Sequence, residues 1–199
     1  MTAPNHEPAG GHHRPSSLSG QNLLVMQQVT GFLSNDFAIE DEHGQVLAQG
    51  RTLGSAASRF FGGSRRLEIL GLDGTVLLEV QDPRTFGRDR YRVTGPAGEP
   101  IAEIVQRIAF FRTSVQISVV DGTVLRLDGS LSGFSFSLMA GDSAVATVDR
   151  QWAGLGKALM GRSRYAVSLD PAMPEVVRHA VIGSVIALDL IRDKAERNN

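Results

Sequence analysis

A short pattern of apolar and polar positions recurs five times along the chain. Each copy begins with two apolar residues that are separated by one residue, continues with a polar stretch and ends in a second apolar run, as in LEILGLDGTVLL from Leu67. In every copy a glycine follows the first apolar residue by seven positions, at Gly44, Gly74, Gly98, Gly122 and Gly141. Alternation is typical of a strand with one buried face, and glycine at a fixed offset indicates a fixed turn. The pattern predicts five consecutive β-hairpins.

Two further apolar runs flank the repeats. Residues 22–28 (NLLVMQQ) and 163–169 (SRYAVSL) are predicted to be the first and last strands. Five hairpins and these two runs make about twelve strands, and a twisted open sheet rarely exceeds about ten. We therefore expect either a closed barrel or two packed sheets, and closure would remove the exposed edges.

The segment after the last strand lacks period-two alternation. Pro174 suits a helix start with Glu175 in the first turn, and every residue from Ala180 to Leu188 is apolar or small. A bilayer span needs about 20 largely apolar residues, and this run is shorter because charged residues interrupt it on both sides. A barrel of about twelve strands is wider than its own side chains can fill. We predict a closed, mainly β, twelve-stranded antiparallel barrel of consecutive hairpins around a buried helix at 174–192.

Composition adds boundaries and exclusions. The length of 199 residues favours one domain, which we place at 21–194, and the Pro-, Gly- and His-rich residues 1–20 are predicted to be a disordered tail. The net charge of -1 gives no global attraction to nucleic acid. The chain has no cysteine and no HExxH or GxSxG motif, so we predict neither an enzyme nor a cofactor or metal site. No apolar export signal is visible, and we expect a cytoplasmic protein.

Arginines gather in two stretches of the sequence. RTFGRDRYRV places Arg88, Arg90 and Arg92 in alternation with inward residues, so all three are predicted to project outward from one strand. FFGGSRR ends in Arg65 and Arg66. The planar fork of arginine suits phosphate, and these five residues are our candidate binding site for lipid phosphates.

The alternative is that these charges only solvate the surface. Asp82 and Asp89 are close enough in sequence to neutralise part of the second stretch, and most charge runs are solvated faces. The Phe60–Arg66 stretch can equally be a plain connector.

An ordered series of motifs resembles a known family. Repeated turns are followed by an Arg-x-Trp-x-Gly element at Arg150, Trp152 and Gly154 and by a terminal helix with Asp189-Leu-Ile. In this order the sequence resembles the phospholipid scramblases and the LURP-one-related proteins, which together look like the C-terminal domain of Tubby. The resemblance implies a twelve-stranded barrel threaded by a hydrophobic helix. It also implies association with membranes or anionic lipids, because Tubby-like domains bind phosphoinositide headgroups.

Some features of the animal scramblases are missing from this sequence. Animal scramblases have a cysteine-rich stretch and an acidic calcium-binding segment ahead of the helix, whereas here only Asp170 and Glu175 lie between the last strand and the helix. Calcium takes about six to eight oxygen ligands, so we expect no calcium site. Our first hypothesis is a peripheral module that binds anionic phospholipid headgroups at the inner membrane face. The alternatives are a soluble LURP-one-related scaffold with a protein partner, and phospholipid scrambling itself.

Overall fold

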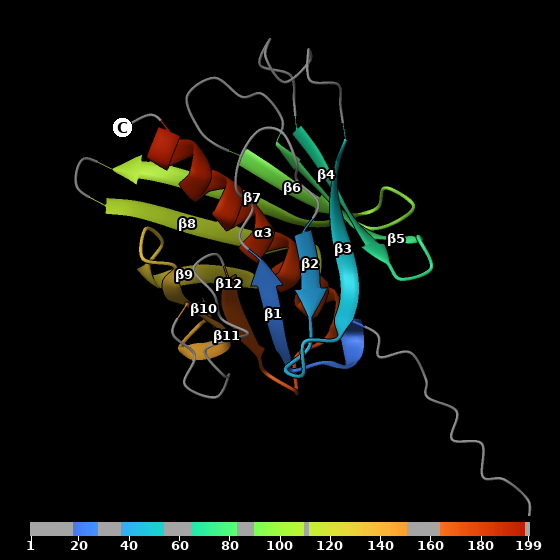
Figure 1. Cartoon of the computed structure of the whole chain (residues 1–199). Helices are drawn as coiled ribbons and strands as arrows, with labels where there is room; N and C mark the ends of the chain where they lie inside the picture. Colours follow the sequence, from blue (N-terminus) through green and yellow to red (C-terminus); the bar gives the residue numbers. More distant parts are fainter. Residues whose placement is uncertain are drawn as a thin grey trace, which may run out of the picture.

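The computed structural model describes residues 18–27, 37–53, 65–82, 90–109, 112–150 and 164–197. Twelve strands form a closed antiparallel barrel, and one long helix runs through it (Figure 1). Every strand pairs with its neighbours in the chain, and the barrel closes where the first strand meets the last. The predicted fold class is confirmed.

The elements follow one another in a simple order. They are a 3-10 helix η1 (Leu18–Gly20), strands β1 (Leu23–Gln27), β2 (Phe37–Glu40), β3 (Val46–Leu53), β4 (Arg65–Gly71), β5 (Val76–Asp82), β6 (Arg90–Thr94), β7 (Pro100–Ala109), β8 (Arg112–Val119), β9 (Val124–Ser130), β10 (Ser135–Ala140), β11 (Ser143–Asp149) and β12 (Arg164–Leu169), and the helix α3 (Glu175–Arg197).

The five predicted hairpins are β2–β3, β4–β5, β6–β7, β8–β9 and β10–β11. Their turns obey the glycine spacing for a physical reason that β4–β5 illustrates. The Gly74 amide donates to the Gly71 carbonyl at 2.9 Å, and Gly74 has φ +79°, a left-handed conformation that favours glycine. Asp73 Oδ1 accepts from the Thr75 hydroxyl at 2.6 Å and from the Thr75 amide at 3.0 Å. The Thr75 hydroxyl hydrogen bond, followed by the amide bond, lowers the pKa of Asp73.

An ion pair spans the seam where the barrel closes. Arg164 on β12 donates Nη1 to Glu40 Oε2 at 3.0 Å and Nη2 to Glu40 Oε1 at 3.1 Å. Glu40 lies on β2, and β1 pairs with both of these strands. The two-bond fork therefore ties the strands on either side of β1 and adds geometric specificity to closure.

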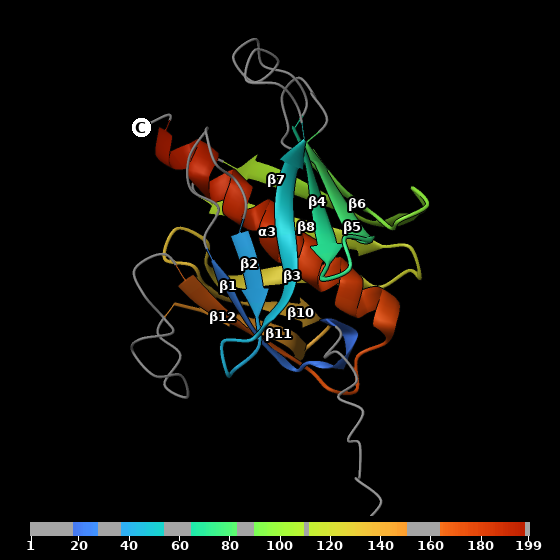
Figure 2. The ribbon, with the colours of Figure 1, turned by 45° about the vertical axis from the view of Figure 1, so that its right-hand side comes forward.

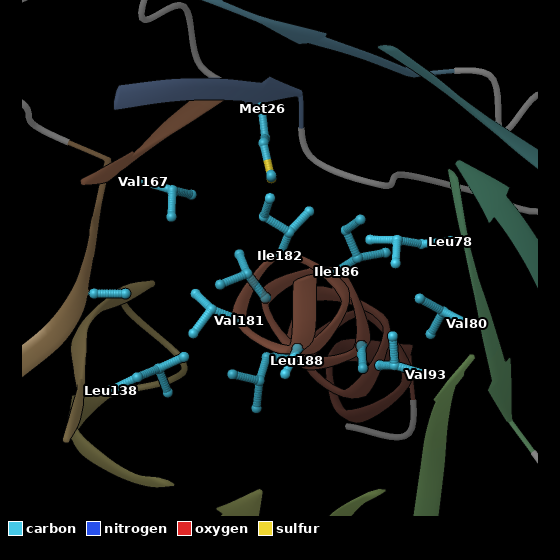
Figure 3. Close-up of a cluster of buried hydrophobic side chains, with 14 of the residues drawn as sticks. Met26, Leu78, Val80, Val93, Leu138, Val167, Val181, Ile182, Ile186 and Leu188 are labelled. Atoms are coloured by element: carbon cyan, nitrogen blue, oxygen red, sulfur yellow. The ribbon is translucent and has the colours of Figure 1, made fainter. Parts of the chain in front are cut away.

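The helix fills the interior on all sides. Val181, Ile182, Ile186 and Leu188 are 0% exposed, and they face wall residues such as Leu138 (Figure 3). Figure 2 shows the helix crossing the barrel obliquely. Among the described residues, no helix combines the length and the apolar character needed to cross a bilayer.

The structure shifts two predicted boundaries. The helix begins at Glu175 and continues to Arg197, beyond the predicted end at 192. Leu18–Gly20, which the prediction assigned to a disordered tail, form η1, and Leu18 is 4% exposed. That part of the predicted tail is wrong because Leu18 has an apolar site to enter. Residues 1–17 lie outside the described residues.

A side chain at Gly183 is expected to destabilise the barrel, because the helix backbone lies close to Val93 of β6 at this position. A Cβ added there would lie 2.6 Å from Cγ1 and 2.7 Å from Cγ2 of Val93. Overpacking costs about 1–3 kcal/mol, and alanine gains back about 1 kcal/mol of helix propensity over glycine. Gly183→Ala should therefore lower the free energy of unfolding in urea titrations. In a Val93→Ala background, which removes both clashing methyl groups, the same substitution should become neutral or stabilising. A loss of equal size in both backgrounds would contradict the close approach.

Candidate functional site

The outward arginines lie on β4 and β6. Arg66 and Arg92 are exposed, and Arg90 is half-buried. On β6, Tyr91 and Val93 alternate with these arginines and point inward, with 1% and 0% of their surface exposed. This is the alternation that the sequence predicts. Arg65 begins β4, but its side chain is outside the described part of the structure, as is the whole of Arg88.

The strand register brings Arg66 and Arg92 into one row. Arg66 lies opposite Gln81 of β5, and Gln81 lies opposite Arg92 of β6. Adjacent strands are about 4.8 Å apart, so two spacings separate the arginine backbones by about 10 Å. The two long side chains flank an amide side chain and can converge on one tetrahedral anion. Nothing in the linear sequence shows this row, because it depends on the register of three strands.

Glutamates on the barrel wall pair with two of these arginines. Arg66 Nε lies 3.1 Å from Glu79 Oε1, and Arg90 Nη1 lies 3.3 Å from Glu103 Oε1. Half-exposed pairs of this kind contribute at most about 1 kcal/mol each. Within the described part of the chain, Arg92 forms no ion pair. Glu79 and Glu103, which are distant in sequence from their partners, thus neutralise part of this surface.

One rim of the barrel is rich in arginine, and we call it the arginine rim. It is the end at which β4, β6, β8 and β12 start, and each of these four strands begins with arginine: Arg65, Arg90, Arg112 and Arg164. Alternate strands of an antiparallel barrel start at the same end, so these positions share one rim. Asp82 and Asp149 end β5 and β11 at the same rim. Of these four arginines, Arg90 and Arg164 have described side chains, and they pair with Glu103 and Glu40 respectively.

A second group of polar residues lies inside the barrel. Asp189 and Arg192 are 0% and 3% exposed, and Arg192 Nη2 is 3.2 Å from Asp189 Oδ1. The Arg192 guanidinium also lies over the ring of Phe134, 4.9 Å from its centre. In the sequence these two charges mark the limit of the apolar run, whereas the barrel encloses both. Their spacing of three positions on a helix was the available signal.

Tyr165 of β12 completes the wall of this buried group. Its ring centre lies 4.5 Å from that of Phe134. Burial, and then the nearby charge of Asp189, raise the pKa of Tyr165 well above its usual value. This environment keeps the phenol neutral and suits packing around an ion pair.

Histidines and acids do not gather into a metal site in the residues that the structure describes, where no group of three or more potential ligands occurs. His43 lies in the β2–β3 turn, 3.7 Å from Glu42. His179 lies in the second turn of α3, 4.0 Å from Glu175.

A family model places the chain among known proteins. The LURP-one-related domain matches residues 21–189, which is most of the chain. The chain belongs to the LURP-one-related family. The predicted resemblance to this family is confirmed, and the wider resemblance to scramblases and Tubby stays a prediction. Of the element Arg150, Trp152 and Gly154, only Arg150 lies within the described residues of this LURP-one-related protein.

Known structures support the fold. The X-ray structure of a protein from Arabidopsis thaliana is similar to this LURP-one-related barrel with a TM-score of 0.52 and 18% identity, over 85% of this chain and 91% of that one. At this identity the likeness concerns the fold alone. No curated protein sequence matches the chain significantly.

Proposed function

We propose that this LURP-one-related barrel is a non-enzymatic, peripheral module that binds the phosphate groups of anionic phospholipids. The row formed by Arg66, Gln81 and Arg92 carries the proposal. Arg90 on β6 extends the same basic surface, while Arg88 and the side chain of Arg65, which complete the predicted site, lie outside the described part of the structure. In the cell, such a module acts in the cytoplasm at the inner face of the membrane, where anionic lipids give a negative surface potential.

The ion pairs on the barrel wall determine which arginine contacts a phosphate first. Arg92 has no glutamate within ion-pairing distance in the described structure, so it makes the first contact. Arg66 is held by Glu79 and reaches the ligand only by exchanging a carboxylate for a phosphate, which offers similar bidentate geometry. Binding that depends on exposed guanidinium groups weakens as salt rises. The resemblance to Tubby-like domains, which bind phosphoinositide headgroups, adds to the proposal.

Arg92→Gln is expected to weaken sedimentation with anionic liposomes about fivefold at low salt, because one basic side chain near such a surface is worth about 1 kcal/mol. Glu79→Gln should strengthen it, since Arg66 is then released from its carboxylate partner. The measurement compares phosphatidylserine-containing with phosphatidylcholine liposomes.

Matched controls lie elsewhere on the barrel. Arg126 on β9 is exposed and donates to the Gly141 carbonyl at 2.9 Å, so Arg126→Gln makes the same charge change away from the row. Glu99→Gln is the matched control for Glu79→Gln, because it also removes one negative charge away from the row. Equal recovery with both liposome types would refute lipid binding, and equal weakening by Arg126→Gln would refute the proposed site.

The alternative of a soluble interaction protein has an observation of its own. Apolar side chains are exposed at the end of the barrel opposite the arginine rim.

A further inference from the structure

The end of the barrel opposite the arginine rim holds the hairpin turns 41–45, 71–75, 95–99 and 119–123, and we call it the turn end. A pocket of about 510 Å³ opens there between η1, the β4–β5 and β6–β7 turns and the first turns of α3. Much of its wall is apolar, formed by Leu18, Leu47, Leu72, Leu77, Pro96 and Ile101. Pockets lined in this way with a few polar groups are typical binding sites.

Apolar residues at the tips of the turns extend this surface. Each turn has the hydrogen bond from its glycine to the residue three positions earlier, which places Leu72, Pro96 and Val120 at the second turn position. Leu72 is 58% exposed and Val120 61%, and with Val124 at 46% they are the exposed large hydrophobic residues of the described chain. All of them lie at this end. The Val120 amide donates to the Ile101 carbonyl at 2.9 Å, which ties the third tip to the pocket wall.

Carboxylates surround the apolar surface. Asp73, Glu99 and Glu175 line the pocket, and its described lining includes no lysine or arginine. Asp121 follows the exposed Val120. These charges are fixed in place, since Asp73, Glu99 and Asp121 each accept a hydrogen bond from a backbone amide of their own turn.

The groups that face the pocket from the helix leave the acidic character unchanged. The Ser19 hydroxyl lies 3.2 Å from Glu175 Oε1 and 3.5 Å from His179 Nε2. Arg178 is buried and occupied, because it donates to the Gln21 carbonyl and, at 3.0 Å, to Asn22 Oδ1. The turn end therefore presents an apolar hollow and apolar tips within a negative rim.

We propose that the turn end is a docking site for a polypeptide segment that carries a bulky apolar side chain next to lysine or arginine. The apolar side chain enters the pocket, and the neighbouring cations meet Asp73, Glu99 and Glu175. An anionic membrane does not fit this end, since like charges repel. A small cationic amphiphile would occupy the pocket alone, whereas the apolar and acidic positions continue along three turns to Val120 and Asp121. A chain segment matches that length.

The test measures fluorescence anisotropy of a short fluorescein-labelled peptide made of leucine and lysine. Comparison peptides carry serine in place of leucine, or glutamate in place of lysine. We expect only the leucine–lysine peptide to bind. Leu72→Ser with Val120→Ser should weaken it about tenfold, and Asp73→Asn with Glu99→Gln by a similar factor. These positions are at the surface, and Asp73→Asn keeps the oxygen that Thr75 binds, so the fold is retained.

Controls separate this site from the proposed lipid site. Asp142→Asn removes an exposed carboxylate of the β10–β11 turn that does not line the pocket, and it should leave peptide binding unchanged. Arg92→Gln should also leave it unchanged, while Leu72→Ser with Val120→Ser should leave liposome binding unchanged. The two proposals can therefore fail independently.

Several outcomes would overturn the inference. They are equal binding of the serine peptide, an equal effect of Asp142→Asn, and absence of binding by the leucine–lysine peptide. Full competition by monomeric dodecyltrimethylammonium would assign the pocket to small amphiphiles instead. Self-association of the protein that Leu72→Ser with Val120→Ser abolishes would assign it to a second copy of the chain.

Discussion

Asp189→Leu is expected to destabilise the barrel by about 3–5 kcal/mol, because removing one partner of a buried ion pair leaves an uncompensated charge. Arg192 is 3% exposed and lies 3.2 Å from Asp189, so water cannot take over the role of the carboxylate without opening the barrel. The Phe134 ring, over which the Arg192 guanidinium lies, is a weaker electrostatic partner than a carboxylate. Urea denaturation followed by circular dichroism measures the loss.

A double substitution tests the cause. Asp189→Leu with Arg192→Met replaces both charges by apolar groups of similar size, and exchanges of this kind are often neutral or stabilising. We expect the pair to recover most of the loss. As a control at a less buried pair, Glu68→Gln at the Arg51–Glu68 pair, whose side chains are 54% and 15% exposed, should cost no more than about 1 kcal/mol. Additive losses in the double variant would show that the two charges are not coupled.

Leu188→Ala is expected to cost about 2–5 kcal/mol, since truncation of a fully enclosed leucine loses burial and leaves a cavity. Leu188 is 0% exposed and packs among the residues of Figure 3. Leu72→Ala makes the same chemical change at a side chain that is 58% exposed, and it should stay within about 0.5 kcal/mol of the parent.

Thermal and urea unfolding of the two variants give this comparison directly. Similar losses at Leu188 and Leu72 would mean that the helix is not enclosed in solution, and the docking surface would then need a different explanation as well. A large loss at Leu188 alone would support both the filled barrel and the peripheral position of Leu72.

The fold was predictable because its signals are local. A glycine with positive φ at each of the five hairpin turns requires the spacing that the sequence repeats, as Gly74 shows. The enclosed helix follows from apolar residues on all of its faces. The predicted tail was less accurate, since a single leucine, Leu18, enters the core from a stretch of polar composition. The average polarity of residues 1–20 does not reveal a single buried leucine.

The candidate sites were only partly predictable because they depend on register. Arg66 and Glu79 pair although they are thirteen positions apart, since β4 and β5 bring them together. Leu72 and Val120 each stand before an Asp-Gly pair, and in the sequence they are simply turn residues. Their exposure on either side of the β6–β7 turn appears only once consecutive hairpins are arranged around a common axis.

The position of α3 after all twelve strands has a consequence for biosynthesis. The ribosome synthesises all the strands before the helix that fills the barrel. The apolar inner face of the sheet is therefore uncovered until the helix emerges. Such an intermediate is prone to aggregation and calls for a chaperone during translation. Ribosome stalling just after β12 should therefore yield an insoluble product, whereas release of the full chain allows the sheet to close around α3.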